Sequence, residues 1–127
     1  MQKYNTINKD GKDTSTSYQT LYQISLENYY CGTNGPTKYL LDSNGNIIAQ
    51  GFNNYEYIQT KETLRDKIFI IYEDRTEIYN VQKKKVAATI NTTGLKFDSY
   101  YAYEIIGDTT NYYSYENGDK FYTLSET

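Results

Sequence analysis

Short apolar runs alternate with polar turns along most of the chain, a pattern typical of a protein built from β-hairpins. The apolar residues 39–41 and 47–49 flank Asp42–Asn46, and the Asn-Gly step within that stretch tolerates the positive φ angles of a tight turn. Residues 112–122 repeat the pattern around Asn117-Gly118. The spacing therefore predicts two hairpins.

A nearly continuous apolar run at residues 68–72 is rich in β-branched side chains and predicts a central strand. We expect residues 77–81 to form its neighbour and residues 86–90 to follow after a lysine-rich turn at 83–85.

Residues 97–106 are expected to form one long strand, paired with the hairpin at 112–122 across the short connection 107–111. Successive side chains of a strand point to opposite faces. The expected faces are, on one side, Phe97, Tyr101, Tyr103 and Ile105, and on the other, Tyr100, Ala102, Glu104 and Ile106.

Helical patterns are scarce. Residues 18–26 fit either a short helix or a strand, of which the strand is favoured, and residues 60–66 fit a loop or a single helical turn. We therefore predict an all-β fold, an antiparallel meander of about eight to ten short strands, closed as a barrel or folded as two packed sheets. A single domain is expected over residues 1–127, with 1–17 as a looser N-terminal segment.

Turns recur along the chain at Gly11, Gly45 and Gly118, with spacings of 34 and 73 residues. Aligning Asp42 with Asn80 places a further turn at the missing middle position, so that hairpins recur about every 35 residues. Such a period is typical of stacked or radially arranged β units, but hairpins of any β meander also recur regularly.

Residues 39–58 resemble a WG repeat, which consists of an apolar strand, an Asp, a Gly turn, an apolar strand and a third strand containing Tyr. Tyr55 and Tyr57 fill that third strand, whereas the Trp and paired Gly of the repeat are missing. The resemblance implies β-hairpin units and a role in interactions, and it carries over no functional residues.

The composition excludes several kinds of chemistry. The absence of histidine removes Ser-His and Cys-His nucleophiles, and one cysteine, Cys31, supplies neither a disulfide nor a thiolate zinc site. Neither a phosphate-binding glycine motif nor a proper calcium loop is present. We expect no enzyme activity, no metal and no cofactor. A glycosidase-like carboxylate pair is the alternative, with these candidates: Glu56, Asp98, Glu104 and Glu116.

The charge balance, 13 basic against 16 acidic residues, argues against general binding to nucleic acid, and no apolar run is long enough to span a membrane. The polar N-terminus lacks the apolar core of a secretion signal, although a mature chain would look the same after signal removal. We therefore expect a cytoplasmic protein, in the host cytoplasm if a phage encodes it.

The chain contains 17 tyrosines and no tryptophan, and adjacent tyrosines on a strand cannot all face a core. Exposed tyrosine is favoured at interfaces. The leading hypothesis is a non-enzymatic binding protein, of the kind with which a phage or mobile element blocks a host protein, and the partner is expected to have a basic surface. A nucleotide- or sugar-binding β module is the alternative, and homo-oligomer formation is left open. The expected binding residues are Tyr100, Glu104, Tyr112 and Glu116 on a face opposite Phe97 and Ile105, and then Tyr55 and Tyr57.

Overall fold

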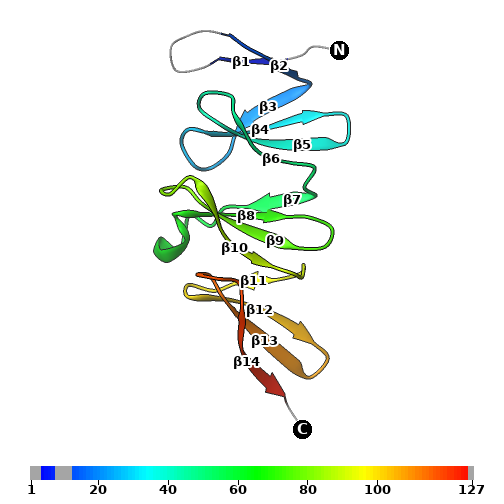
Figure 1. Cartoon of the computed structure of the whole chain (residues 1–127), viewed down its shortest axis with the longest axis vertical. Coiled ribbons are helices and arrows are strands. Elements are labelled where there is room, and N and C mark those ends of the chain that lie inside the picture. Colours follow the sequence, from blue (N-terminus) through cyan, green and yellow to red (C-terminus); the bar gives the residue numbers. More distant parts are fainter. Residues whose placement is uncertain (1–3, 8–12, 126–127) are drawn as a thin grey trace. The chain divides into compact units, whose positions relative to one another are not determined.

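The protein is all-β. A computed structural model describes residues 4–7 and 13–125. These residues form fourteen strands, arranged as one two-stranded hairpin and three four-stranded sheets, and a single short 3-10 helix (Figure 1). Each sheet consists of strands consecutive in the sequence, which confirms the antiparallel meander. The described part of the chain has more strands than expected, and its sheets are open rather than closed as a barrel.

The chain divides into two parts, residues 1–54 and 55–127, which are described separately. In the first part, one hairpin and one sheet are formed by β1 (Tyr4–Ile7), β2 (Asp13–Tyr18), β3 (Thr20–Gln23), β4 (Tyr29–Asn34), β5 (Thr37–Asp42) and β6 (Ile47–Gln50). The strand favoured for residues 18–26 is confirmed at β3. The turn expected at Gly11 lies outside the described residues.

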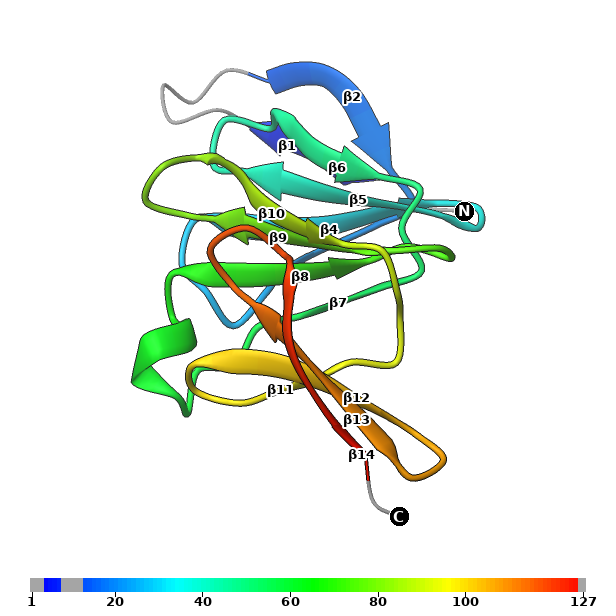
Figure 2. The ribbon, with the colours of Figure 1, turned by 60° about the horizontal axis from the view of Figure 1, so that its bottom comes forward.

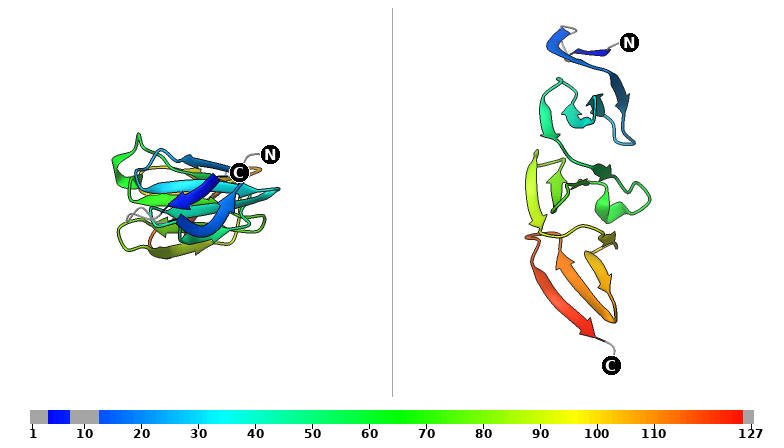
Figure 3. Two further views of the ribbon diagram at one scale, coloured as in Figure 1. Left: turned by 90° about the horizontal axis from the view of Figure 1, so that it is seen from above. Right: turned by 90° about the vertical axis from the view of Figure 1, so that its right-hand side faces the viewer.

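The second part holds two four-stranded sheets. The first sheet contains β7 (Asn54–Glu56), β8 (Lys67–Ile71), β9 (Thr76–Asn80) and β10 (Lys85–Ile90), and the helix η1 (Glu62–Leu64) precedes β8 (Figure 2). The second sheet contains β11 (Lys96–Phe97), β12 (Tyr101–Ile106), β13 (Thr109–Ser114) and β14 (Lys120–Ser125), the last two drawn orange to red in Figure 3.

The three sheets share one design of the turn between their third and fourth strands. The third strand ends in each case at a polar residue whose side-chain oxygen accepts a hydrogen bond from the backbone N–H two residues later. The carbonyl of the same residue accepts the N–H of a residue with positive φ. The pairs of polar residue and positive-φ residue are Asp42 with Gly45, Asn80 with Lys84, and Ser114 with Gly118.

A bulge follows each of these turns at the same distance. The ladder between the third and fourth strands skips one residue, which lies three positions after the positive-φ residue, at Ile48, Ala87 and Phe121. Shared turns and shared bulges establish a repeating unit of four strands. The middle turn expected from the sequence spacing is therefore present, at Lys84.

The core of the second part lies between its two sheets. Phe69, Ile78 and Ile90 of the first sheet are fully buried, and they form one cluster with Phe97 and Ala102 of the second sheet. The rings of Phe69 and Phe97 stack with their centroids 3.8 Å apart. The opposite face of β8 is buried as well, since Ile68 and Ile70 have no exposed surface, and this confirms the prediction of a central strand.

The long strand expected at residues 97–106 is wrong. The chain turns back after Phe97, so β11 and β12 pair as a hairpin with Phe97 opposite Ala102. The Asp98 N–H donates to the Tyr101 carbonyl at 2.9 Å, and the buried Tyr115 hydroxyl donates to the carbonyls of Asp98 and Tyr101 at 2.7 and 2.8 Å. The turn reverses the expected alternation, so Phe97 faces inward together with Ala102 and Glu104.

Candidate functional site

The outer face of the β11–β14 sheet carries a continuous set of large side chains. Tyr103 lies opposite Tyr112, and Tyr112 lies opposite Tyr122, so three tyrosines cross three neighbouring strands. Ile105 and Leu124 flank Thr110 in the same way. We call this surface the tyrosine face and define it by Tyr101, Tyr103, Ile105, Tyr112, Phe121, Tyr122 and Leu124.

Tyr112 is the centre of an aromatic cluster. Its ring centroid lies 5.2 Å from that of Tyr101 in an edge-to-face arrangement, and 5.8 and 6.3 Å from those of Tyr122 and Phe121. Such distances are favourable for ring pairs because the positive ring edge meets the negative ring face. The bulge at Phe121 allows two successive residues of β14 to contact the same ring. The cluster is therefore a pre-ordered surface.

The tyrosine face is exposed to a degree that is unusual for large side chains. Ile105 and Phe121 are each 58% exposed, and Tyr122 is 55% exposed. A contiguous exposed apolar patch on a small protein is a candidate interaction surface. The arrangement is suited to flat apolar contact, with phenol hydroxyls available as hydrogen-bond donors and acceptors.

One acid and one base lie at the edge formed by β11. The negative charge of Asp98 raises the pKa of the Tyr101 phenol above its ordinary value, and desolvation raises it further. Lys96 lies opposite Tyr103 in the β11–β12 ladder. The Tyr101 phenol is therefore protonated at neutral pH, and the rim of the face carries charges of both signs.

The structure separates the residues that the sequence predicted as one site. Tyr112 lies on the tyrosine face, whereas Tyr100 is 79% exposed in the β11–β12 turn and Glu116 is exposed in the β13–β14 turn. Glu104 is buried on the inner face, so its expected place beside Tyr112 is wrong, and Ile105 points outward rather than inward. The cause is the turn at Asp98, which reverses the alternation of β12.

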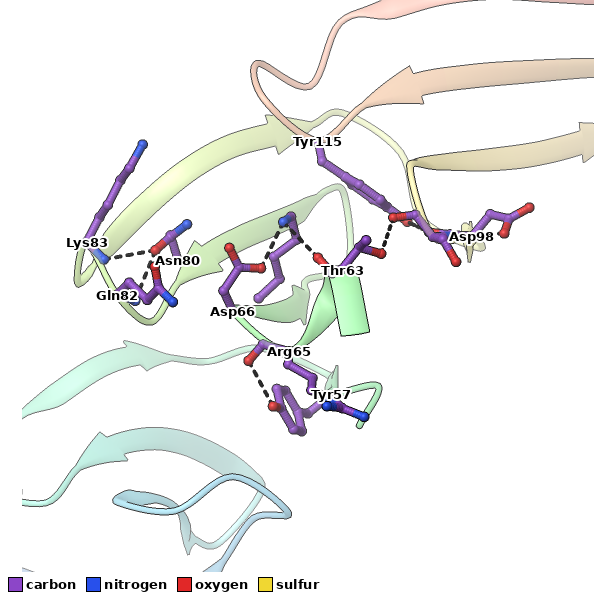
Figure 4. Close-up of polar contacts among 11 residues, drawn as sticks. Tyr57, Thr63, Arg65, Asp66, Asn80, Gln82, Lys83, Asp98 and Tyr115 are labelled. Atoms are coloured by element: carbon purple, nitrogen blue, oxygen red, sulfur yellow. Dashed lines mark hydrogen bonds and ion pairs between the residues drawn. The ribbon is translucent and has the colours of Figure 1, made fainter. Parts of the chain in front are cut away.

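Tyr55 and Tyr57 lie away from the tyrosine face, at the β7 strand of the other sheet of the second part. Tyr55 lies in β7, and Tyr57 follows that strand. The Tyr57 hydroxyl donates to the Arg65 carbonyl at 2.8 Å (Figure 4), and burial raises the pKa of this phenol. Tyr57 thus holds the segment that contains the short helix against β7.

Buried Glu104 accepts three hydrogen bonds. The Tyr113 hydroxyl donates to its carboxylate, as do Thr92 Oγ1 at 3.2 Å and Asn111 Nδ2 at 3.5 Å. Burial and the bond to Glu104 raise the pKa of Tyr113 to about 12. These hydrogen bonds offset the free energy that burying the Glu104 side chain costs.

A separate open hollow of about 350 Å³ lies beside β9 and is lined by Lys67, Ile78, Asn80, Lys83, Ala87, Tyr115 and Glu116. Its polar groups bond largely within the chain. Lys67 Nζ donates to Asp66 Oδ1 at 2.9 Å and lies 5.7 Å from the centre of the Tyr115 ring, and Asn80 Oδ1 accepts two backbone N–H groups of its own turn (Figure 4).

Within residues 4–7 and 13–125, no cluster of three or more histidine, cysteine or acidic side chains is suited to hold a metal ion. In the same residues, no helix has the length and apolar character needed to cross a membrane.

Sequence reasoning missed most of the tyrosine face, namely Tyr101, Tyr103, Phe121, Tyr122 and Leu124. A single strand over residues 97–106 predicts Tyr101 and Tyr103 on the inner face. An Asp-Ser pair at 98–99 can start a turn, and the alternation of β12 follows correctly once the turn is placed there.

Neither the protein-family models nor the curated proteins include a match to this chain. Among solved structures, the computationally designed Ika8 protein is similar, with a TM-score of 0.48 and 9% sequence identity. The similarity covers 91% of this chain and 41% of the designed one, so the chain spans less than half the length of that protein. A likeness at this level defines neither the fold nor the function.

Proposed function

We propose that this chain is a non-enzymatic protein-binding module and that the tyrosine face is its binding surface. The observation that carries the proposal is the ordered ring cluster around Tyr112, which is flanked by large side chains more than half exposed. Ordering these rings before binding reduces the entropy that association would otherwise cost.

The shape of the face favours a protein partner. Tyrosine supplies rigid contact area with only two side-chain torsions and adds a hydroxyl, which is why protein interfaces are enriched in it. The rings lie across three neighbouring strands of one sheet, and a broad surface of this kind suits another protein surface better than it suits a small molecule, which needs a concave pocket.

Charge bears on the kind of partner. The chain carries a net charge of −3, and Asp98 lies beside Tyr101 at the rim. A partner with a basic surface would be steered toward the chain, and an arginine would stack on an exposed ring. Cytoplasmic location and the blocking of a host protein by a mobile-element product remain predictions from composition.

A small-molecule site is the second candidate, and the hollow beside β9 favours it, because two lysines and an asparagine line one concave surface. A nucleotide is the ligand class that lysines and a tyrosine ring would hold there. Isothermal titration with nucleoside phosphates tests this candidate, and Lys83→Ala should abolish any binding at that site.

The test of the main proposal compares two neighbouring residues of β12. Ile105 is on the tyrosine face and 58% exposed, whereas Ile106 is 61% exposed and points to the opposite face. Immobilised wild type, Ile105→Lys and Ile106→Lys should be exposed to lysate from candidate host cells, and the retained proteins identified by mass spectrometry. A partner should be retained by wild type and Ile106→Lys and lost from Ile105→Lys. Equal retention by all three would overturn the proposal.

A further inference from the structure

The residues of the tyrosine face occupy the positions of the repeat that form a buried face in the preceding sheet. Asn80 and Ser114 hold equivalent turns, so the residues of β8–β10 can be matched to those of β12–β14 through the strand pairing. The matched pairs are Phe69 with Tyr103, Ile78 with Tyr112, Ala88 with Tyr122, and Ile90 with Leu124.

In the preceding sheet these positions are an interface between sheets. Phe69, Ile78 and Ile90 have no exposed surface, and all four positions belong to the core cluster that contains Phe97, Ala102 and Tyr115 of the next sheet. In the β11–β14 sheet, Tyr122 and Leu124 at these positions are exposed, and Tyr103 and Tyr112 are half-buried. The tyrosine face is therefore the stacking face of a repeat unit, and a flat β-sheet is the kind of surface that fits it.

We infer that a second copy of this chain covers the tyrosine face, so that two β11–β14 sheets pack face to face. This inference rests on the proposed binding function of the same face and names the partner. A two-fold interface requires one surface to be complementary to itself. The face meets that requirement because small residues alternate with large ones: Thr110 lies between Ile105 and Leu124, and Ser114 lies opposite Tyr101.

Two charges at the rim and the area of the face agree with a pair of copies. Lys96 and Asp98 lie at the same rim, so two copies can bring opposite charges together. A fully exposed aromatic side chain has about 200 Å² of surface. The exposed fractions of the apolar side chains then give on the order of 500 Å² for the face, and two faces bury on the order of 1,000 Å², near the lower limit for a specific interface.

Sedimentation velocity over a wide range of protein concentration tests the inference, with circular dichroism and thermal unfolding as checks that each variant is folded. Wild type and Ile106→Lys should form dimers with the same dissociation constant. Ile105→Lys places a lysine in each half of the interface and should raise that constant by at least about tenfold. Tyr122→Lys, on the exposed strand β14, should act in the same way and replaces Ile105→Lys if that variant does not fold.

The outcomes separate this inference from the proposed function. A wild type that stays monomeric up to several hundred micromolar overturns the second copy as occupant, while loss of a lysate partner from Ile105→Lys would still support binding of a different protein. A dimer that survives both lysine substitutions shows that another surface joins the copies and overturns the inference. Equal loss of the dimer in Ile106→Lys and Ile105→Lys would also overturn the inference, because Ile106 points away from the tyrosine face.

Discussion

The phenol of Tyr113 donates a hydrogen bond to the buried carboxylate of Glu104, and the two residues lie on the inner face of the β12–β13 pair. The Tyr113 phenol bonds to Oε2 of Glu104, while the Thr92 hydroxyl donates to Oε1 at 3.2 Å. The charge of Glu104 is therefore stabilised in the interior through this phenol.

Removal of the Tyr113 hydroxyl should weaken the fold. Tyr113→Phe leaves Glu104 Oε2 with only the 3.5 Å contact from Asn111, and an under-satisfied buried charged group costs about 1–3 kcal/mol. Urea unfolding followed by circular dichroism measures the loss. Tyr112→Phe is the matched control on the neighbouring residue, which lies on the outer face, and it should change the free energy of unfolding by less than about 0.5 kcal/mol. Equal losses in the two variants would contradict the role assigned to Glu104.

The same phenol predicts a fall in stability at alkaline pH. The pKa of Tyr113 is raised from 10.0 to about 12 in the folded chain, so between these values the unfolded state loses the proton and the folded state keeps it. The contribution of the Tyr113 phenol to the free energy of unfolding is fully present below pH 10 and is lost as the pH rises toward 12. Burial raises the pKa of Tyr115 in the same direction.

Urea midpoints measured from pH 8 to pH 12 test this dependence. The wild-type midpoint should fall above pH 10, and Tyr113→Phe should show a shallower fall because it lacks one of the responsible phenols. Identical slopes in the two proteins would mean that the Tyr113 proton is not held by the fold.

The sequence predicts local features of this fold better than it predicts the faces of its sheets. The hairpin at Gly45 was evident because an Asn-Gly step lies between apolar runs, and β8 was evident from its apolar run. The turn after Phe97 contains neither glycine nor proline. The turn is held by the hydroxyl of Tyr115, seventeen residues after Asp98. A hydrogen bond between residues so far apart in the chain cannot be predicted from the local sequence pattern.

That single turn decides which side chains of β12 are exposed. Because strand side chains alternate with a period of two, an error of one position exchanges the two faces completely. Glu104 was therefore expected outside and lies inside, while Ile105 was expected inside and lies outside. Tyr112 was expected on the outer face and lies there, but opposite Tyr103 and not beside Glu104.

Lys84 should be replaceable by glycine with a gain in stability. Its φ of 56° lies in the left-handed region, where the equivalent turns have Gly45 and Gly118. A side chain at positive φ destabilises the fold by roughly 1–2 kcal/mol, and glycine removes this strain. Part of the resulting gain is lost because glycine raises the conformational entropy of the unfolded chain. Lys84→Gly should raise the free energy of unfolding by about 0.5–1 kcal/mol. Lys83→Gly, one residue earlier and without positive φ, should give no gain, and a similar gain there would contradict the explanation.

Gly118 should be far less tolerant of substitution than Gly107, although both have positive φ, 78° and 62°. A Cβ at Gly118 would lie 2.1 Å from the carbonyl oxygen of Thr89 in β10, whereas a Cβ at Gly107 would meet nothing within 4 Å. Gly107→Ala should therefore cost only the backbone strain of about 1 kcal/mol. Gly118→Ala adds a backbone clash between the two sheets and should cost about 3 kcal/mol or more. Thermal and urea unfolding of both variants provide the comparison. Equal losses in the free energy of unfolding would mean that the β13–β14 turn does not approach β10 this closely, and would contradict the packing of the two sheets at that point.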